Sequence, residues 1–171
     1  VTITAGSDTK VYDGTALTKN TYTNTDLAAG DAITSVTVTG SQTVVGNSAN
    51  VPSAAVIKDG SEDVTANYNI TYVNGKLKIN PVEKVIVITA ASDEKVYDGK
   101  PLTNDGYTYT EGVLIAGDVL IATVEGSQTE VGSSANVVTD YKVIRGGARS
   151  LAAGTDVTAN YTFGESIDGT L

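Results

Sequence analysis

The sequence contains no cysteine, histidine, methionine or tryptophan, and Phe163 is its only phenylalanine. Without cysteine the chain can form neither a disulfide nor a thiolate metal site. Without histidine it lacks the commonest zinc ligand and the usual general base at neutral pH. Serine and threonine abound, but no thiol, histidine base or phosphate-binding glycine loop is present to activate them. We therefore predict no cofactor, no metal centre and no enzymatic activity.

Basic residues are also few. The chain has 11 Lys and Arg against 20 Asp and Glu, which gives a net charge of −9. This acidic excess argues against a nucleic-acid partner. No segment approaches the apolar run of about 20 residues that a membrane helix needs, so we predict no membrane insertion. Because there is no signal peptide and no initiator methionine, we interpret the chain as a piece of a longer protein.

A nine-residue motif occurs twice. Lys10–Thr18 reads KVYDGTALT and Lys95–Thr103 reads KVYDGKPLT, and the two tyrosines lie 97 − 12 = 85 residues apart. Two further blocks recur in the same order: GSQT with SANV, at 40–51 and 126–137, and DVTANY, at 63–68 and 156–161. A period of this length is typical of a small domain. We predict two domains, residues 1–81 and 82–171, the second ending inside its last strand.

Alternating apolar and threonine residues mark the strands. Val1–Ala5 and Ile33–Thr39 show the period of two that is typical of half-buried strands, and no window shows a helical period. Asn74-Gly75 is the strongest hairpin signal. The segment 146–154 looks like the tip of an enlarged hairpin. We predict an all-β fold of two tandem domains, sandwich or β-grasp-like, arranged end to end through a semi-rigid linker, Asn80–Lys84.

The three repeated blocks resemble the YDG/MBG-type tandem repeats of bacterial cell-surface proteins, especially those of Gram-positive bacteria. Both copies match, so the resemblance covers nearly the whole chain. It implies extracellular repeats in an adhesin or a wall-attached stalk, with a β-grasp-like or other all-β fold. It supplies no catalytic residues.

The repeated tyrosines and acids have ordinary structural interpretations. Tyr12 and Tyr97 lie at a strand end beside the Asp-Gly turn, where we expect each ring to fill the core rather than to stack on a sugar. Tyr68 and Tyr161 are interpreted in the same way. The aspartates that recur in both copies flank turn residues, where they bind their own backbone. We favour that role over a Ca²⁺ site or a catalytic pair.

Two sets of residues are candidates for more than a structural role. Lys10 with Asn67, and Lys95 with Asn160, could form Lys–Asn cross-links, promoted by the nearby aspartates Asp13 and Asp98. The alternative is a turn asparagine and a solvated lysine. Tyr107, Tyr109 and Tyr141 lie in more variable surroundings and are candidates for exposed ligand contacts.

Two functions remain open at this point. The first is a structural stalk, spacer or adhesive repeat module of a bacterial cell-surface protein, located extracellularly on the cell surface or cell wall. The second is a dedicated binding module for host glycan, mucin or extracellular matrix protein, which would use the loop 138–155 and the segment 104–114. Neighbouring repeats of the same chain are further expected partners.

Overall fold

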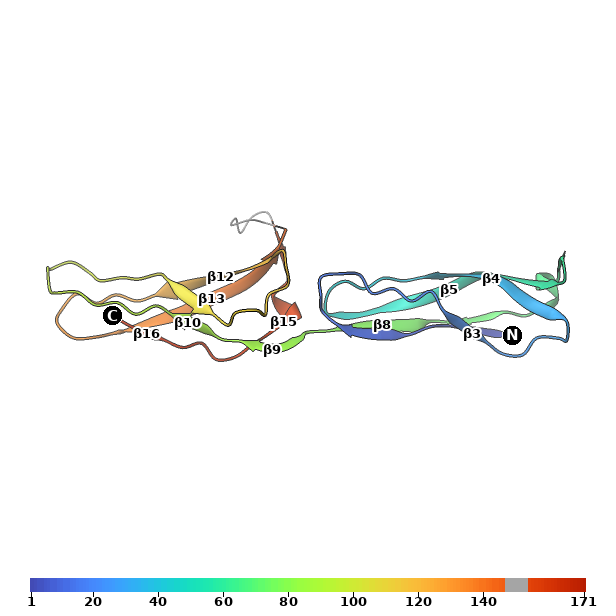
Figure 1. Ribbon diagram of the computed structural model, residues 1–171, viewed down its shortest axis with the longest axis horizontal. Coiled ribbons are helices and arrows are strands. Elements are labelled where there is room, and N and C mark those ends of the chain that lie inside the picture. Colours follow the sequence, from blue (N-terminus) through green and yellow to red (C-terminus); the bar gives the residue numbers. More distant parts are fainter. Residues whose placement is uncertain (147–153) are drawn as a thin grey trace. The chain divides into compact units, whose positions relative to one another are not determined.

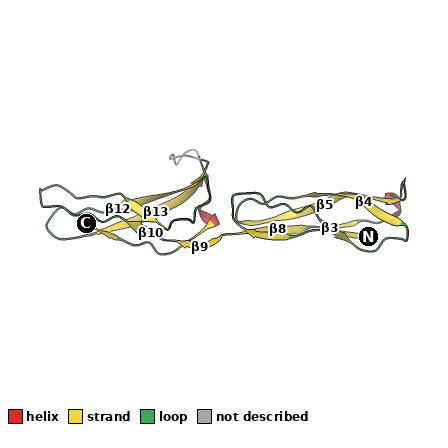
Figure 2. Cartoon of the chain, viewed as in Figure 1, coloured by secondary structure: helices red, strands yellow, loops and turns green. Residues whose placement is uncertain are grey.

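The computed structural model describes residues 1–146 and 154–171, and these form two compact units, Val1–Asn80 and Pro81–Leu171 (Figure 1). The predicted all-β fold is confirmed (Figure 2). The strands of the first unit are β1 (Thr2–Ala5), β2 (Asp8–Val11), β3 (Tyr22–Asn24), β4 (Asp31–Thr39), β5 (Gly46–Asp59), β6 (Glu62–Asp63), β7 (Thr71–Val73) and β8 (Gly75–Asn80). Those of the second are β9 (Val82–Ile86), β10 (Ile88–Ala90), β11 (Tyr107–Tyr109), β12 (Asp118–Glu125), β13 (Ala135–Arg145), β14 (Thr155–Asp156), β15 (Tyr161–Phe163) and β16 (Gly169–Thr170).

Helical structure in the described residues is limited to two 3₁₀ turns of three residues, η1 (Thr65–Asn67) and η2 (Thr158–Asn160). A β-grasp fold needs a helix long enough to cross its sheet. Three residues at about 2 Å each cannot do this. The described parts of both units therefore do not fit the β-grasp-like alternative.

The first unit has two sheets. One has the order β3-β1-β7, and the other has the order β2-β8-β5-β4 with β6 also paired to β5. The long strand β5 joins the second sheet together, because its first five residues pair with β8 and the rest pair with β4 and β6. The first two strands of the unit pair in parallel with its last two strands: β1 pairs with β7, and β2 pairs with β8.

The second unit repeats much of this arrangement with shorter pairings. β12 and β13 form its longest antiparallel pair, and β14 and β16 also pair with β13. β10 pairs with β11, and β9 pairs in parallel with β15. The predicted enlarged hairpin, 146–154, falls largely on residues 147–153, which lie outside the described residues. The strands that flank it, β13 and β14, are antiparallel neighbours.

The predicted hairpin at Asn74-Gly75 is wrong. β7 and β8 lie on either side of Asn74 but belong to different sheets: β7 pairs with β1, whereas β8 pairs with β2 and β5. Gly75 is needed for another reason. A Cβ on this residue would lie 2.2 Å from the carbonyl oxygen of Gly6 and 2.6 Å from that of Ala5. The glycine allows two backbones to approach closely where the chain changes sheet.

The linker is also shorter than expected. β8 ends at Asn80 and β9 begins at Val82, so only Pro81 of the predicted linker 80–84 separates the two strands. Proline has no N–H to donate to a sheet, which is consistent with a break at this position.

Each unit has its own small core, made by the alternating apolar residues of its strands. The burial of β8 alternates along the strand, with Leu77 and Ile79 buried and the lysines beside them exposed. The buried apolar side chains of the first unit are Ile3, Ala5, Tyr12, Leu17, Pro52, Ala55, Ile57, Leu77 and Ile79. Those of the second unit are Ile86, Ile88, Ala90, Val113, Leu120, Val124, Val143, Ile144, Val157, Tyr161 and Leu171.

Candidate functional site

The repeated Lys-Val-Tyr-Asp-Gly motif forms a turn held by its aspartate. Asp13 Oδ1 accepts hydrogen bonds from Lys10 Nζ at 2.8 Å and from the backbone N–H and hydroxyl of Thr15, at 2.9 and 2.7 Å. Gly14 has a φ of 78°, which favours glycine. In the second copy Asp98 Oδ1 accepts from Lys95 Nζ at 2.7 Å and from the N–H of Lys100 at 3.0 Å. The predicted turn role is thus what the geometry shows.

These bonds change the acidity of the aspartates. The hydrogen bond from Lys10 Nζ, together with those from Thr15, holds the pKa of Asp13 well below its usual range. Lys95 lowers the pKa of Asp98 in the same way. Asp63 and Asp156, which precede the two 3₁₀ turns, also have lowered pKa values, because each accepts hydrogen bonds from the threonine two residues on.

We expect both units to lose stability in acid. The folded pKa values of these four aspartates lie below the unfolded values, so in this range the unfolded chain binds more protons. Their contribution is present above about pH 4 and is lost as the pH falls through the folded pKa values. Thermal unfolding between pH 5 and pH 2 tests this, with Asp13→Asn expected to flatten the pH dependence of the first unit. Equal pH slopes for the two proteins would contradict it.

A tyrosine–aspartate pair recurs at a second place in each unit. Tyr68 donates its hydroxyl to Asp31 Oδ2 at 2.5 Å and accepts from the N–H of Ala28 at 3.0 Å. The bond to the Asp31 carboxylate raises the pKa of Tyr68. In the second unit Tyr161 donates to Asp118 Oδ2, also at 2.5 Å. Through these hydrogen bonds, the segment that follows the 3₁₀ turn of each unit is attached to the Ala-Gly-Asp turn of the same unit.

The residue opposite the aspartate of this pair differs in charge between the two units. Opposite Asp118, Arg145 donates through Nε to Asp118 Oδ1 at 2.5 Å. At the corresponding place opposite Asp31 the first unit has Asp59, which is also acidic. The second copy therefore has an ion pair where the first has two carboxylates. The Asp118 side chain is fully buried in this pair, so it serves the fold.

The structure does not bring the proposed cross-linking residues together. Lys10 pairs with Ile79, which pairs with Gly46 at the start of β5. Asn67 lies in η1, whose Thr65 contacts Ile57 near the other end of β5. Gly46 and Ile57 are 57 − 46 = 11 residues apart along one strand, about 36 Å at 3.3 Å per residue. A lysine side chain cannot span that distance.

The same holds for Lys95 and Asn160. Lys95 lies two residues after Asp93, whose N–H donates to the carbonyl of Thr170, the partner of Ala135 at the start of β13. Asn160 lies in η2, which contacts Val143 through Thr158. Eight residues of β13, about 26 Å, separate Ala135 from Val143. The two asparagines also differ from each other, since Asn67 is exposed and Asn160 is buried.

The three tyrosines proposed as ligand contacts occupy two places. Tyr107 and Tyr109, both half-buried on β11, line a shallow hollow of about 400 Å³ with Glu111 and Leu114. Tyr107 also donates a long hydrogen bond, 3.4 Å, to the carbonyl of Leu120. Tyr141 lies on β13 and packs on Phe163, with their ring centroids 4.3 Å apart. It is not one of the residues that line the hollow.

The sequence analysis missed one pair of buried residues, Asn50 and Asn136, which are inaccessible to solvent. Asn50 Nδ2 donates to the carbonyls of Gly6 and Lys19, at 2.9 and 2.6 Å. Asn136 Nδ2 makes the matching bonds to the carbonyls of Ala91 and Asn104, at 2.8 and 2.7 Å. Each side chain therefore clamps two loops onto its long strand. The recurrence of SANV in both copies was the signal that could have found them.

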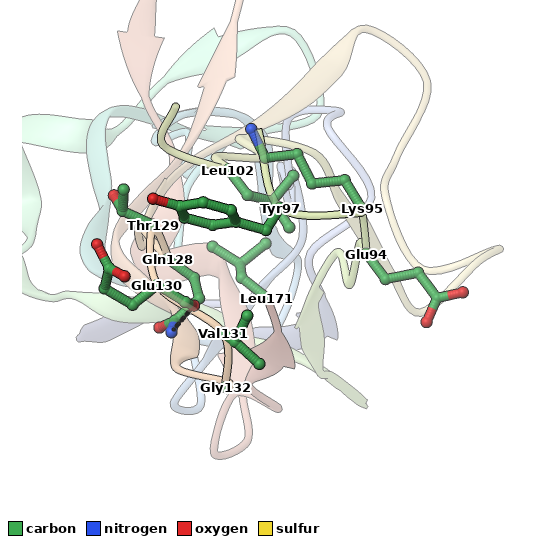
Figure 3. Close-up of a pocket in the computed structure, with 10 residues that line it drawn as sticks. All are labelled: Glu94, Lys95, Tyr97, Leu102, Gln128, Thr129, Glu130, Val131, Gly132 and Leu171. Carbon is green, nitrogen blue, oxygen red and sulfur yellow. Dashed lines mark hydrogen bonds between the residues drawn. The ribbon is translucent and has the colours of Figure 1, made fainter. Parts of the chain in front are cut away.

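Tyr12 and Tyr97, which correspond in the two copies, differ in burial. Tyr12 is 2% exposed, as predicted for a core residue, whereas Tyr97 is 56% exposed. The core interpretation of Tyr97 is therefore wrong. Tyr97 instead lines a hollow of about 170 Å³ with Leu102, Val131 and Leu171 (Figure 3).

One family model matches the first part of the chain. Residues 1–78 match the family model described as the MBG domain (YGX type). This match supports an MBG/YDG-type repeat, as the sequence motifs had indicated. No curated protein and no solved structure matches the chain. Within the described residues, no helix is long and apolar enough to cross a membrane, and no group of three or more metal-ligating side chains occurs.

Proposed function

We propose that this chain is a load-bearing spacer, part of the stalk or adhesive repeat region of a bacterial cell-surface protein. The match to an MBG domain supports a repeat module of a surface protein. The polar residues that both copies share support a structural role, because they bind within their own unit. Asp13, Tyr68 and Asn50, with their counterparts in the second unit, are all engaged in this way.

The observation that favours load-bearing is the pairing of the first and last strands of the first unit. β1 runs parallel to β7 in three residue pairs, and β2 runs parallel to β8 in four. The chain therefore enters this unit at one end and leaves it at the other (Figure 1). Pulling on the two ends shears all 3 + 4 = 7 pairs against one another at once, because the hydrogen bonds lie across the strands.

Single-molecule force measurements test this role. The chain has no cysteine, so an introduced cysteine gives a unique attachment point. We expect the first unit to unfold at a clearly higher force when pulled through the two ends of the chain than when pulled through the N-terminus and Ser61→Cys. Ser61 follows the end of β5, which runs antiparallel to β8 and therefore ends away from Asn80, on the side of the N-terminus. The second geometry thus peels β1 from β7 one pair at a time.

The length released identifies the unit in each trace. When the chain is pulled through its two ends, opening the 80 residues of the first unit adds at most about 290 Å of extended chain. With the second handle at position 61, the 61 residues between the handles add at most about 220 Å. Equal forces in the two geometries, or a lower force through the chain ends, would contradict a load-bearing design. A variant with a cysteine at the exposed Thr43, elsewhere in the same unit, controls for the effect of the handle itself.

A second candidate function is a binding module for host glycan, mucin or matrix protein. The hollow beside Tyr107 and Tyr109 favours it, because half-buried tyrosines offer a flat apolar face with a polar tip. The loop that includes residues 147–153 lies outside the described residues, and residues 138–145 are part of β13 rather than a loop. A screen against immobilised glycans and matrix proteins, with Tyr109→Ala as the matched variant, separates this role from that of a spacer.

A further inference from the structure

The strand β4 of the first unit has a long edge without a strand partner. β4 has nine residues and pairs with β5 along one side, and no other strand of the described residues pairs with it. The backbone groups on its outer side therefore lack the partners that a neighbouring strand would supply. An edge of this kind can accept a strand from another chain.

The last five residues of β4, Ser35–Thr39, form a regular stretch of this edge. One irregularity in the pairing with β5 precedes the stretch, since the extra residue is Thr34, and the other adds its extra residue on β5. The side chains alternate: Val36 and Val38 are half-buried, and the three hydroxyl residues between and beside them are exposed. The stretch is therefore an extended, two-faced strand segment.

The segment Ser35–Thr39 carries none of the residues that protect strand edges in natural proteins, because it contains no charged residue and no proline. The corresponding strand of the second unit, β12, differs. Glu125 stands there in place of Thr39, and the hydroxyl of Tyr107 donates to the carbonyl of Leu120. The same strand thus occurs in both units, but only the first unit leaves this segment of it neutral.

The charge of the two units also differs. Residues 1–80 contain 5 basic and 7 acidic residues, a net charge of 5 − 7 = −2, whereas residues 81–171 contain 6 and 13, a net charge of 6 − 13 = −7. Two copies of this chain therefore repel each other less when they approach through their first units than through their second units. The neutral edge lies on the unit where a second copy meets the weaker repulsion.

We propose that Ser35–Thr39 is a self-association site, at which the β4 edges of two copies of this chain pair antiparallel with Thr37 opposite Thr37 of the second copy. A strand that pairs with itself in this way forms a two-fold contact in which both copies use the same surface. Antiparallel pairing also keeps Asp31 of one copy away from Asp31 of the other, whereas parallel pairing in register would place the two carboxylates side by side.

The two faces of the strand fix the register of this pairing. With Thr37 at the centre, Val36 lies opposite Val38 of the second copy, so the half-buried faces meet and the hydroxyl faces meet. Moving the centre to Val36 would bring the bulged Thr34 into the pairing, and moving it to Val38 would bring in Gly40. Only the centre at Thr37 pairs all five residues of the regular stretch.

The contact is small, so the association of two free chains is weak. Five residues on each side bury less than the roughly 1,000 Å² of a stable specific interface. Such a contact becomes effective where many chains are held close together, because a high local concentration replaces affinity. The association is independent of the load-bearing role, since it uses an edge that the force does not act on directly.

Disulfide trapping tests which residues face each other, because the chain has no cysteine of its own. Directly opposed residues of an antiparallel pair have Cα atoms about 4.5–5.5 Å apart, which a disulfide can span. The matched control is Thr123→Cys, at the corresponding exposed position of β12. In a glutathione redox buffer we expect Thr37→Cys to form the disulfide dimer at least about tenfold faster, because pairing raises the effective concentration of its thiols.

The direction of the strands is tested with Ser35→Cys and Thr39→Cys. Each variant alone should form disulfide dimers slowly, since like positions of antiparallel strands centred on Thr37 lie four residues apart, about 13 Å. A mixture of the two variants should form the mixed dimer rapidly, because Ser35 then lies opposite Thr39. Rapid dimer formation by Ser35→Cys alone would show parallel strands and would overturn the proposed pairing.

A pair of charge variants keeps the test independent of cysteine chemistry. Thr37→Lys and Thr37→Glu should each associate less than the unchanged protein in sedimentation equilibrium, because like charges then lie directly opposite each other. An equal mixture of the two should associate more strongly than either alone, which a folding defect would not produce. Equal disulfide formation by Thr37→Cys and Thr123→Cys, or a mixture that associates no more than its components, would overturn the self-association site.

Discussion

Replacing Asn50 by aspartate is expected to destabilise the first unit by about 3 kcal/mol or more. Asn50 Nδ2 donates to two backbone carbonyls from different loops, and its side chain is inaccessible to solvent. A carboxylate would place an acceptor against both carbonyl oxygens and would leave them unpaired. Each buried polar group left without a partner costs about 1–3 kcal/mol, and a buried charge costs more.

Urea unfolding monitored by hydrogen exchange of each unit measures this effect. Asn47→Asp is the matched control, because Asn47 lies on the same strand but is exposed. Asn136→Asp should produce the same loss in the second unit and leave the first unchanged. A loss no larger than that of Asn47→Asp would show that the clamp contributes little. The two carbonyl acceptors also fix which amide atom of Asn50 is the nitrogen.

Replacing Gly75 by alanine is expected to destabilise the first unit by about 2–4 kcal/mol. The added methyl group would lie 2.2 Å from the carbonyl oxygen of Gly6, where real Cβ atoms essentially never lie. The obstructing atoms belong to backbone, so no side-chain rotation relieves the contact. The shift would also disturb the bond from Asn50, because the Gly6 carbonyl is one of its two acceptors.

Gly60→Ala provides the control for this prediction. Gly60 has a φ of 57°, but a Cβ there would meet no atom within 4 Å. Its replacement costs only the backbone strain of a left-handed residue, about 1–2 kcal/mol. If Gly75→Ala costs no more than Gly60→Ala, then the close approach of the two backbones is not what requires glycine. Chemical denaturation of the two variants in parallel decides between these outcomes.

Local sequence predicted the strands but not their partners. The alternation in Ile33–Thr39 and the shared period of the two copies identified β4 and the duplication, because both signals depend on neighbouring residues alone. Asn74-Gly75 led to a wrong prediction. This dipeptide commonly favours a hairpin turn, but in this protein its glycine allows one strand to pass close to another. Which segments pair depends on contacts between residues about 70 positions apart, which a local pattern does not contain.

For some candidate site residues the local sequence predicted the role, and for others the role depends on the fold. The turn role of Asp13 and Asp98 was predictable, because an aspartate before glycine binds its own backbone. The cross-link between Lys10 and Asn67 was not testable from the sequence, since the length of β5 that separates them appears only in the fold. In the sequence, Asn50 and Asn136 lie in the block Ser-Ala-Asn-Val, where a polar side chain is expected on the surface. Only the packed loops around them make them buried clamps.

The sequence by itself determined that the protein is a tandem of two small β units without cysteine or histidine. It determined the two Asp-Gly turns as well, because aspartate and glycine select them locally. The tertiary structure decided whether the tyrosine of each Tyr-Asp-Gly turn is in the core. Tyr12 and Tyr97 have the same neighbours in sequence, but Tyr12 is buried and its N–H donates to the carbonyl of Asn80, at the far end of its unit, whereas Tyr97 is exposed. Burial of a strand end depends on the strand that lies beside it, and that strand comes from a distant part of the chain.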